Sequence, residues 1–265
     1  MKTSIFTIFK IEVTKLFKRK DWLVLLALIG VSILMGAAIS SEGYTGVPNQ
    51  SALLWASSQI LNSSLLFITP LIFAFLSTRI LASEIENGSI LLYTNKYRNR
   101  GRMYLAKSLA LLFFSIITLI IMFLVNIFIY YLLVNRSPVY ASGNFFGENT
   151  ALLWLSIVVI YLSSFILASQ CALCLSSFLK PAPIIGIMFF ITMLLHNTFK
   201  TPVFQIINPW HYVALIGADV NGTSDYYPVN WGETTGTLLS FFLLVAIYVL
   251  LFNFVGKRKF EKMDL

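Results

Sequence analysis

The sequence predicts an all-α integral membrane protein with six transmembrane helices, an N-terminal amphipathic interfacial helix, and short outer re-entrant helices between spans five and six. Apolar residues make up 58% of the 265 residues and charged residues only 11%, whereas a soluble domain carries about 25% charged residues. The mean hydropathy is +0.81. Six apolar runs also approach or exceed the roughly 20 residues that a helix needs to cross a bilayer.

The amphipathic helix is predicted at residues 1–20. On a helical wheel, most apolar residues of this arm fall on one half and most lysines on the other, with Glu12 as an exception inside the apolar arc. A basic amphipathic helix of this kind lies in the membrane interface rather than crossing the bilayer. The alternative is a short cytosolic tail whose periodicity arises by chance. No small-residue cleavage site follows the first apolar run, so we expect a retained helix rather than a signal peptide.

The six-span bundle is predicted at residues 22–255. The second run carries several polar residues in its outer half and Pro70 near its middle, and the fifth run is short and follows Pro181. Between the fifth and sixth runs lies a long loop, residues 198–235, in which we expect one or two short helices at 203–218. The runs are Trp22–Ile39, Leu53–Leu81, Tyr104–Val134, Ala151–Leu179, Pro183–Phe199 and Gly236–Val255.

The distribution of lysine and arginine predicts the orientation of the bundle. All of the 19 basic residues except Arg136 and Lys200 fall before the first run, around the second-to-third loop, or after the fourth and sixth runs. Positively charged loops stay in the cytoplasm, so we expect both termini to be cytoplasmic. The net charge of +8 is then a signal of topology. We predict no nucleic-acid partner, because no basic soluble face is present.

The chain lacks the motifs of an enzyme, so we assign no catalytic residue. It has no G-x-x-x-x-G-K-[ST] stretch to cradle ATP phosphates, no H-E-x-x-H, and no plausible Ser/His/Asp set. Cys171 and Cys174 suit either a metal or redox pair or simple helix packing, and we assign no metal site. Ionisable groups are almost absent from the apolar runs, which argues against an ion-coupled carrier. The functional class that remains is a membrane component that another protein drives.

We expect that the driving protein acts on this chain at the cytoplasmic loop, residues 82–103. The loop places Glu84 and Glu86 beside the membrane, where acidic residues favour the start of a short helix. Gly88 permits a tight bend or a close backbone approach. The basic residues that follow suit the anionic inner leaflet. The alternative is a plain positive loop that only fixes topology, but this alternative does not account for two acids and a glycine.

This loop resembles that of the ABC-2 type permease family, the membrane domains of type II ABC exporters. In that family the second span ends in E-x-E-x-G-[ST]-[IL], followed by an Arg-containing turn and an A-K that opens the third span. Here Arg100 and Arg102 lie in the turn, Ala106 and Lys107 close it, and Tyr97 lies where many members have a proline. The resemblance extends over residues 1–265 as one transmembrane domain. The residues that match the first part of the motif are Glu84, Glu86, Gly88, Ser89 and Ile90.

The resemblance implies a mechanism and a set of partners. Two membrane domains, either identical or sister chains, pair in the plasma membrane of a bacterium, and two separate ABC ATPase subunits bind ATP and Mg below them. The chain itself carries no cofactor. Closure of the ATPases moves the spans through a coupling contact made by the five motif residues, and substrate is expelled. Short six-span members resemble exporters and immunity systems that confer antibiotic resistance, which implies amphipathic peptides or hydrophobic small molecules as substrates.

The expected substrate path lies between the two membrane domains and is lined by the second and fifth spans. For each candidate the alternative is helix packing, because small and amide side chains also join helices in lipid. Two other functions stay open: a non-transporting scaffold or sensor partner in a signalling complex, and a lipid-modifying enzyme, against which the absent acid–base cluster argues. The candidates are Gln59, Asn62, Ser63, Ser64, Phe67, Met193, His196 and Asn197.

Overall fold

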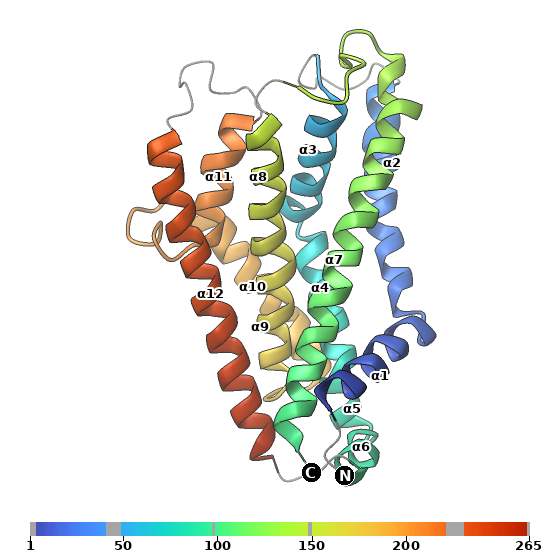
Figure 1. The fold of residues 1–265 in the computed structure, drawn as a ribbon, viewed down its shortest axis with the longest axis vertical. Helices are drawn as coiled ribbons and strands as arrows, with labels where there is room; N and C mark the ends of the chain where they lie inside the picture. Colours follow the sequence, from blue (N-terminus) through green and yellow to red (C-terminus); the bar gives the residue numbers. More distant parts are fainter. Residues whose placement is uncertain (1–3, 41–48, 97–98, 148–149, 221–230, 264–265) are drawn as a thin grey trace.

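The computed structural model describes residues 4–40, 49–96, 99–147, 150–220 and 231–263, and the regular elements within them are helices (Figure 1). Six helical stretches are long and apolar enough to cross a membrane, which confirms the predicted number and indicates a multi-pass membrane protein. Residues 1–3, 97–98 and 221–230 of the predicted arm and loops fall outside the described ranges. The six stretches are Asp21–Ser40, Ile68–Glu86, Arg100–Arg136, Leu153–Leu175, Pro181–Thr198 and Gly236–Glu261.

The helix α7, Arg100–Leu132, is the longest element and runs the length of the bundle (Figure 1). Asn99 caps its start, because the side-chain oxygen of Asn99 accepts a hydrogen bond from the backbone N–H of Arg102 at 3.0 Å. The first span consists of the short 3₁₀ segment η1, Asp21–Leu25, and the helix α2, Leu26–Ser40. It packs on α7 closely enough that a Cβ on Gly36 would lie 2.6 Å from the side chain of Ile129.

The single run predicted at Leu53–Leu81 forms two helices, α3 at Ala52–Leu65 and α4 at Ile68–Ile80. Pro70 explains the interruption, because it has no N–H to donate to the carbonyl four residues before it. At the break, Phe67 adopts a left-handed backbone with φ 60°, which is uncommon for a residue with a side chain.

The fourth span contains a π-helical segment that the sequence analysis did not predict. The helix α8, Thr150–Ile160, passes through the π segment η3, Tyr161–Ile166, into α9, Leu167–Leu175. Gln170 on α9 joins three spans, because its side-chain oxygen accepts hydrogen bonds from Ser108 on α7 at 2.7 Å and from Asn253 on the last helix at 3.0 Å. Polar side chains commonly join helices within membranes in this way.

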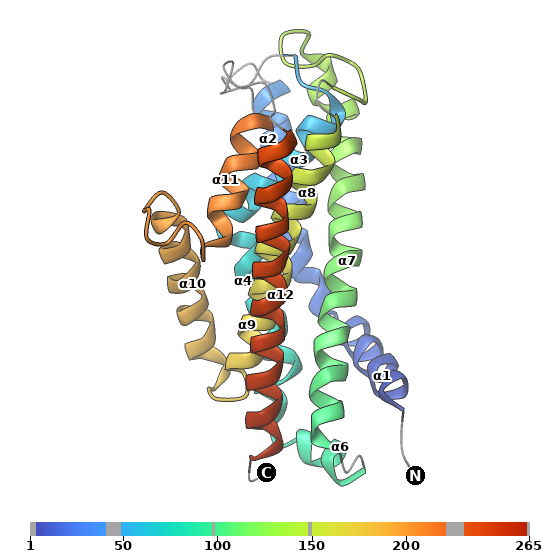
Figure 2. The same cartoon turned by 60° about the vertical axis from the view of Figure 1, so that its left-hand side comes forward.

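The last three helices are α10 at Pro181–Thr198, α11 at Pro209–Val220 and α12 at Trp231–Glu261. Figure 2 shows α10 on the outer side of the bundle, where it packs on α4, with α11 above it. The helix α11 falls in the region where short outer helices were expected, and it packs against α8 and α12 with Trp210 and Tyr212 buried. The loop between the fifth and sixth spans therefore contributes a helix to the bundle itself.

Candidate functional site

The elements predicted to face the cytoplasm lie together at the lower end of the bundle in Figure 1. They are the helix α1, Ile5–Lys18, the short helices α5, Ala82–Glu86, and α6, Ile90–Lys96, and the last turns of α12. The start of α7 contacts the end of the chain here, since the guanidinium of Arg100 donates to the carbonyl of Met263. At this end of the molecule the N-terminal arm, the charged loop and the end of the chain lie together (Figure 1).

The helix α1 packs its apolar face against α7, with Ile8 and Leu16 buried. The ring of Phe9 lies edge-on to Phe113 of α7, with 5.7 Å between the ring centroids. Glu12, the residue that interrupted the predicted apolar arc, is on this packed face and is only 2% exposed. An unpaired carboxylate would be costly in that position, so its partners decide what it does.

Lys107 is the main partner of Glu12. Its side chain is fully buried, and its ammonium lies 3.0 Å from Oε2 of Glu12 and 2.7 Å from Oε2 of Glu84. It also donates to the backbone carbonyl of Ile80 at 2.9 Å. The three acceptors match the three N–H donors of a lysine ammonium. One buried cation on α7 therefore links α1 to the segment that follows the second span.

Two further cations, Lys15 of α1 and Arg19 directly after it, complete the arrangement. Lys15 lies 2.8 Å from Oε1 of Glu12 and 3.0 Å from Oε1 of Glu84, and Arg19 lies 2.6 Å from the same Glu84 oxygen. We call Glu12, Lys15, Arg19, Glu84 and Lys107 the buried charge cluster; both acids and Lys107 are buried, Lys15 is half-buried, and Arg19 lies at its exposed edge. Both oxygens of each carboxylate in it are engaged by cations, so two acids hold three helices together.

The buried charge cluster is more important for geometry than for net stability. Moving charged groups out of water is costly, and a buried ion pair often gains little over apolar packing. Removing one partner is different, because it leaves an uncompensated charge in the interior. The cluster thus favours a single arrangement of α1, α5 and α7, and a shift of α5 relative to α7 must break its contacts or carry the other two helices along.

The five motif residues divide between interior and surface. Glu84 is 2% exposed and Ile90 is fully buried, so both contact the rest of the chain. Glu86 is exposed at the end of α5. Gly88 has a φ of +67°, which confirms the predicted bend between two short helices. Ser89 lies just after that bend, and its hydroxyl donates to the backbone carbonyl of Glu84 at 3.4 Å.

The exposed part of this region is a small surface at the turn from α5 to α6. Its exposed residues include Glu86, Asn87 and Leu92, and the Leu92 side chain is 74% exposed. We call these three residues the turn surface. An anionic group, an amide and an aliphatic side chain are exposed here. They lie close in the chain to Glu84, whose carboxylate belongs to the buried charge cluster.

Three of the predicted path residues are buried inside the chain. Gln59, Ser63 and Ser64 are each at most 3% exposed. The hydroxyls of Ser63 and Ser64 both donate to the carbonyl of Ile60, and Ser63 accepts from Thr69 at 3.1 Å across the break between α3 and α4. Ser63 therefore links the two parts of the interrupted second span, and Ser64 bonds within α3, which is the packing role that the sequence analysis left open.

The other path residues lie at or near the surface. Asn62 and Phe67 are half-buried, and Met193 and Asn197 are exposed one turn apart on α10. Phe67 meets the fifth span at His196, with 5.7 Å between the ring centroids in an edge-to-face contact. The structure thus brings the second and fifth spans together at these two rings.

Sequence reasoning missed the partners of Glu84. Two signals pointed to them: the acid within the apolar arc of the arm, Glu12, and a lysine at the start of a long apolar run, Lys107.

Cys171 and Cys174 are both free thiols on α9. Among the described residues, no three His, Cys, Asp or Glu side chains gather as a metal ion requires. No family model and no curated protein matches the chain.

Proposed function

We propose that the chain is the membrane permease subunit of an ATP-driven exporter and that a separate ATPase acts on it at the turn surface. In this account the plasma membrane surrounds the six spans, with both termini in the cytoplasm and α1 in the inner interface. The ATPase supplies ATP and Mg, and a second membrane domain completes the path. The exported substrates are amphipathic peptides or hydrophobic small molecules.

The observation that carries the proposal is the position of Glu84 next to the turn surface. A partner needs an exposed contact, which Glu86 and Leu92 offer, and it needs a mechanical connection to the spans. Glu84 supports that connection, because its two oxygens bind cations of α1 and α7. A push on the turn would therefore reach the longest span directly and the interfacial arm at the same time.

The break in the second span supports movement of α4 relative to α3, farther along the span from the turn surface. The left-handed backbone at Phe67 and the missing N–H of Pro70 leave α3 and α4 joined by few backbone hydrogen bonds. Breaks of this kind absorb the changes in backbone angle that accompany domain motion. A displacement of α4 from the cytoplasmic end can then reorient Phe67 and its contact with His196 without unfolding α3.

The proposal is tested by transport in inside-out membrane vesicles that contain the chain together with a co-expressed candidate ABC ATPase. The probe is a fluorescent cationic amphipathic peptide, and the expected result is uptake that requires ATP and both proteins. A Glu86→Lys variant should lose most of the uptake, whereas Glu261→Lys, an exposed acid at the same end on α12, should keep it. If the ATPase binds the chain without ATP and no amphipathic probe is taken up, the result would instead favour a scaffold or sensor function.

A further inference from the structure

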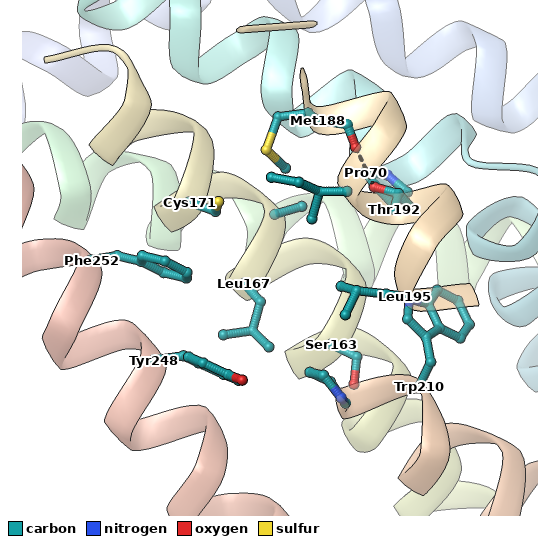
Figure 3. A pocket seen from close by; sticks show the side chains of 13 residues that line it. Pro70, Ser163, Leu167, Cys171, Met188, Thr192, Leu195, Trp210, Tyr248 and Phe252 are labelled. Atoms are coloured by element: carbon teal, nitrogen blue, oxygen red, sulfur yellow. Dashed lines mark hydrogen bonds between the residues drawn. The ribbon is translucent and has the colours of Figure 1, made fainter. Parts of the chain in front are cut away.

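A cavity of about 270 Å³ lies between α4, α9, α10, α11 and α12. Figure 3 shows its lining, with Cys171 and Met188 at one end and Ser163 and Trp210 at the other. It is separate from the buried charge cluster, and none of the eight predicted path residues lines it. An apolar cavity of about 150 Å³ is large enough for benzene, so this one takes a larger apolar group.

The shape of the cavity suits a chain rather than a compact ring system. Its lining follows one face of the fourth span from Ser163 to Cys171, a rise of about 12 Å at 1.5 Å per residue. A matching row on α10 runs from Met188 to Leu195. Tyr248 and Phe252 of α12 supply a third wall. The cavity is therefore a trough with its length along the axes of α9, α10 and α12, and residues of α4 and α11 complete its wall.

Ser163 provides one polar contact at the end of this trough. Its side chain is 7% exposed, and its hydroxyl has no hydrogen-bond partner among the described residues. Other serines of the same span, Ser156 and Ser169, donate to backbone carbonyls of the preceding turn. Ser163 lies within the π segment η3, where the backbone departs from the α-helical pattern. Insertions of this kind are frequent at functional sites.

The two other hydroxyls of the lining, those of Thr192 and Tyr248, are already engaged. Thr192 donates to the carbonyl of Met188 at 2.7 Å, and the Tyr248 hydroxyl donates to the carbonyl of Ile207 at 2.8 Å. Among the described residues, none of those that line the cavity is charged. Because an isolated charge is costly in an apolar site, the group that meets the Ser163 hydroxyl is neutral.

We propose that this cavity binds one aliphatic chain that bears a single neutral hydrogen-bonding group, such as a long-chain alcohol or ester, with that group at Ser163. This site is independent of the proposed exporter function, because binding needs neither an ATPase nor a second copy. The chain lies along the trough toward Cys171 and Met188.

The test is photolabelling of the purified full chain in nanodiscs with a long-chain alcohol that carries a diazirine within its chain. We expect labelled peptides from the fourth and fifth spans around Ser163 and Ile191, and competition by the unlabelled alcohol. Ile191→Trp fills the trough and should lower labelling several-fold. Leu194→Trp is the matched control, because Leu194 lies on the same helix, is 44% exposed and does not line the cavity.

A second pair of variants tests the polar contact. Ser163→Ala should lower labelling by the alcohol but not by a diazirine alkane of equal length. Ser164→Ala is its control, since Ser164 is buried, also lacks a hydrogen-bond partner among the described residues, and does not line the cavity.

Two results would overturn the proposal. The first is labelling that spreads over the exposed faces of α10 and α12 and is equal in both tryptophan variants, which would mean partition into the bilayer. The second is labelling of these peptides by a diazirine phosphatidylcholine that the alcohol does not compete away, which would assign the cavity to phospholipid acyl chains. Equal effects of Ser163→Ala and Ser164→Ala would refute the role of the Ser163 hydroxyl.

Discussion

The fully buried ammonium of Lys107 lies 2.7 Å from a carboxylate oxygen of Glu84. Lys107 belongs to the third span and Glu84 to the short helix after the second span. Their ion pair therefore joins the end of the second span to the start of the third, on either side of the turn surface. Glu12 binds the same ammonium from the N-terminal arm at 3.0 Å. Three segments that are far apart in the sequence therefore depend on one cation.

Replacing Lys107 with methionine should be strongly destabilising. The change keeps most of the length of the side chain but leaves Glu12 and Glu84 with fewer cations in a buried site, and breaking a buried pair costs about 3–5 kcal/mol. Thermal unfolding in detergent should show a large drop in melting temperature. Lys18→Met on the exposed face of α1 is the control and should unfold like the wild type. Adding Glu84→Gln to Lys107→Met should recover part of the loss, by an interaction energy on the order of 0.5–3 kcal/mol.

Replacing Glu12 with alanine should loosen the arm without unfolding the bundle. The arm would keep its apolar contact with α7 but lose the carboxylate that Lys15 and Lys107 share. Hydrogen–deuterium exchange should then increase in α1 and stay unchanged in α10, which does not contact the cluster. Unchanged exchange in α1 would mean that apolar packing alone holds the arm.

The close approach of the first and third spans depends on Gly36. A Cβ there would lie 2.6 Å from the Ile129 side chain, and overpacking a core typically costs about 1–3 kcal/mol. Gly36→Leu should therefore lower the melting temperature. Gly30→Leu should be tolerated, because no atom lies within 4 Å of a Cβ at Gly30. Equal melting temperatures for the two variants would contradict the packing of α2 on α7.

The bend at Gly88 should be sensitive to backbone conformation rather than to space. Gly88 has a φ of +67° with open space around a Cβ, and a left-handed backbone costs a residue with a side chain roughly 1–2 kcal/mol. Gly88→Ala should reduce ATP-dependent transport while the bundle stays folded by size-exclusion chromatography. Gly186→Ala, also with open space but without a positive φ, should transport normally. Normal transport by Gly88→Ala would remove the bend from the mechanism.

The number of spans could be predicted because run length and hydropathy are properties of the local sequence. The break at Phe67 could be predicted only in part: Pro70 marked the place, but whether a proline kinks or divides a helix depends on the neighbouring helices that satisfy the freed carbonyls. The π segment at Ser163 carried no local signal that we recognised.

The roles of Glu84 and Glu86 could not be separated from the sequence. Both lie in one short acidic stretch, and only the packing of α1 and α7 against Glu84 distinguishes the buried acid from the exposed one. The arm gave the clearest missed signal. Glu12 within an apolar arc looked like an imperfection of the pattern, but it is the acid that meets Lys107 across the packed face.

The most direct test of the proposed function is a pull-down of a co-expressed candidate ABC ATPase by the tagged chain, with ATP hydrolysis measured on the recovered complex. The wild type should recover the ATPase and stimulate its hydrolysis. Glu86→Lys should abolish recovery, because it reverses a charge on the turn surface, while Glu261→Lys should recover the ATPase like the wild type. Glu84→Gln should still recover it but no longer stimulate hydrolysis. Recovery and hydrolysis that are unchanged in both Glu86→Lys and Glu84→Gln, or no recovery by the wild type, would contradict the claim that an ATPase drives this protein through the turn.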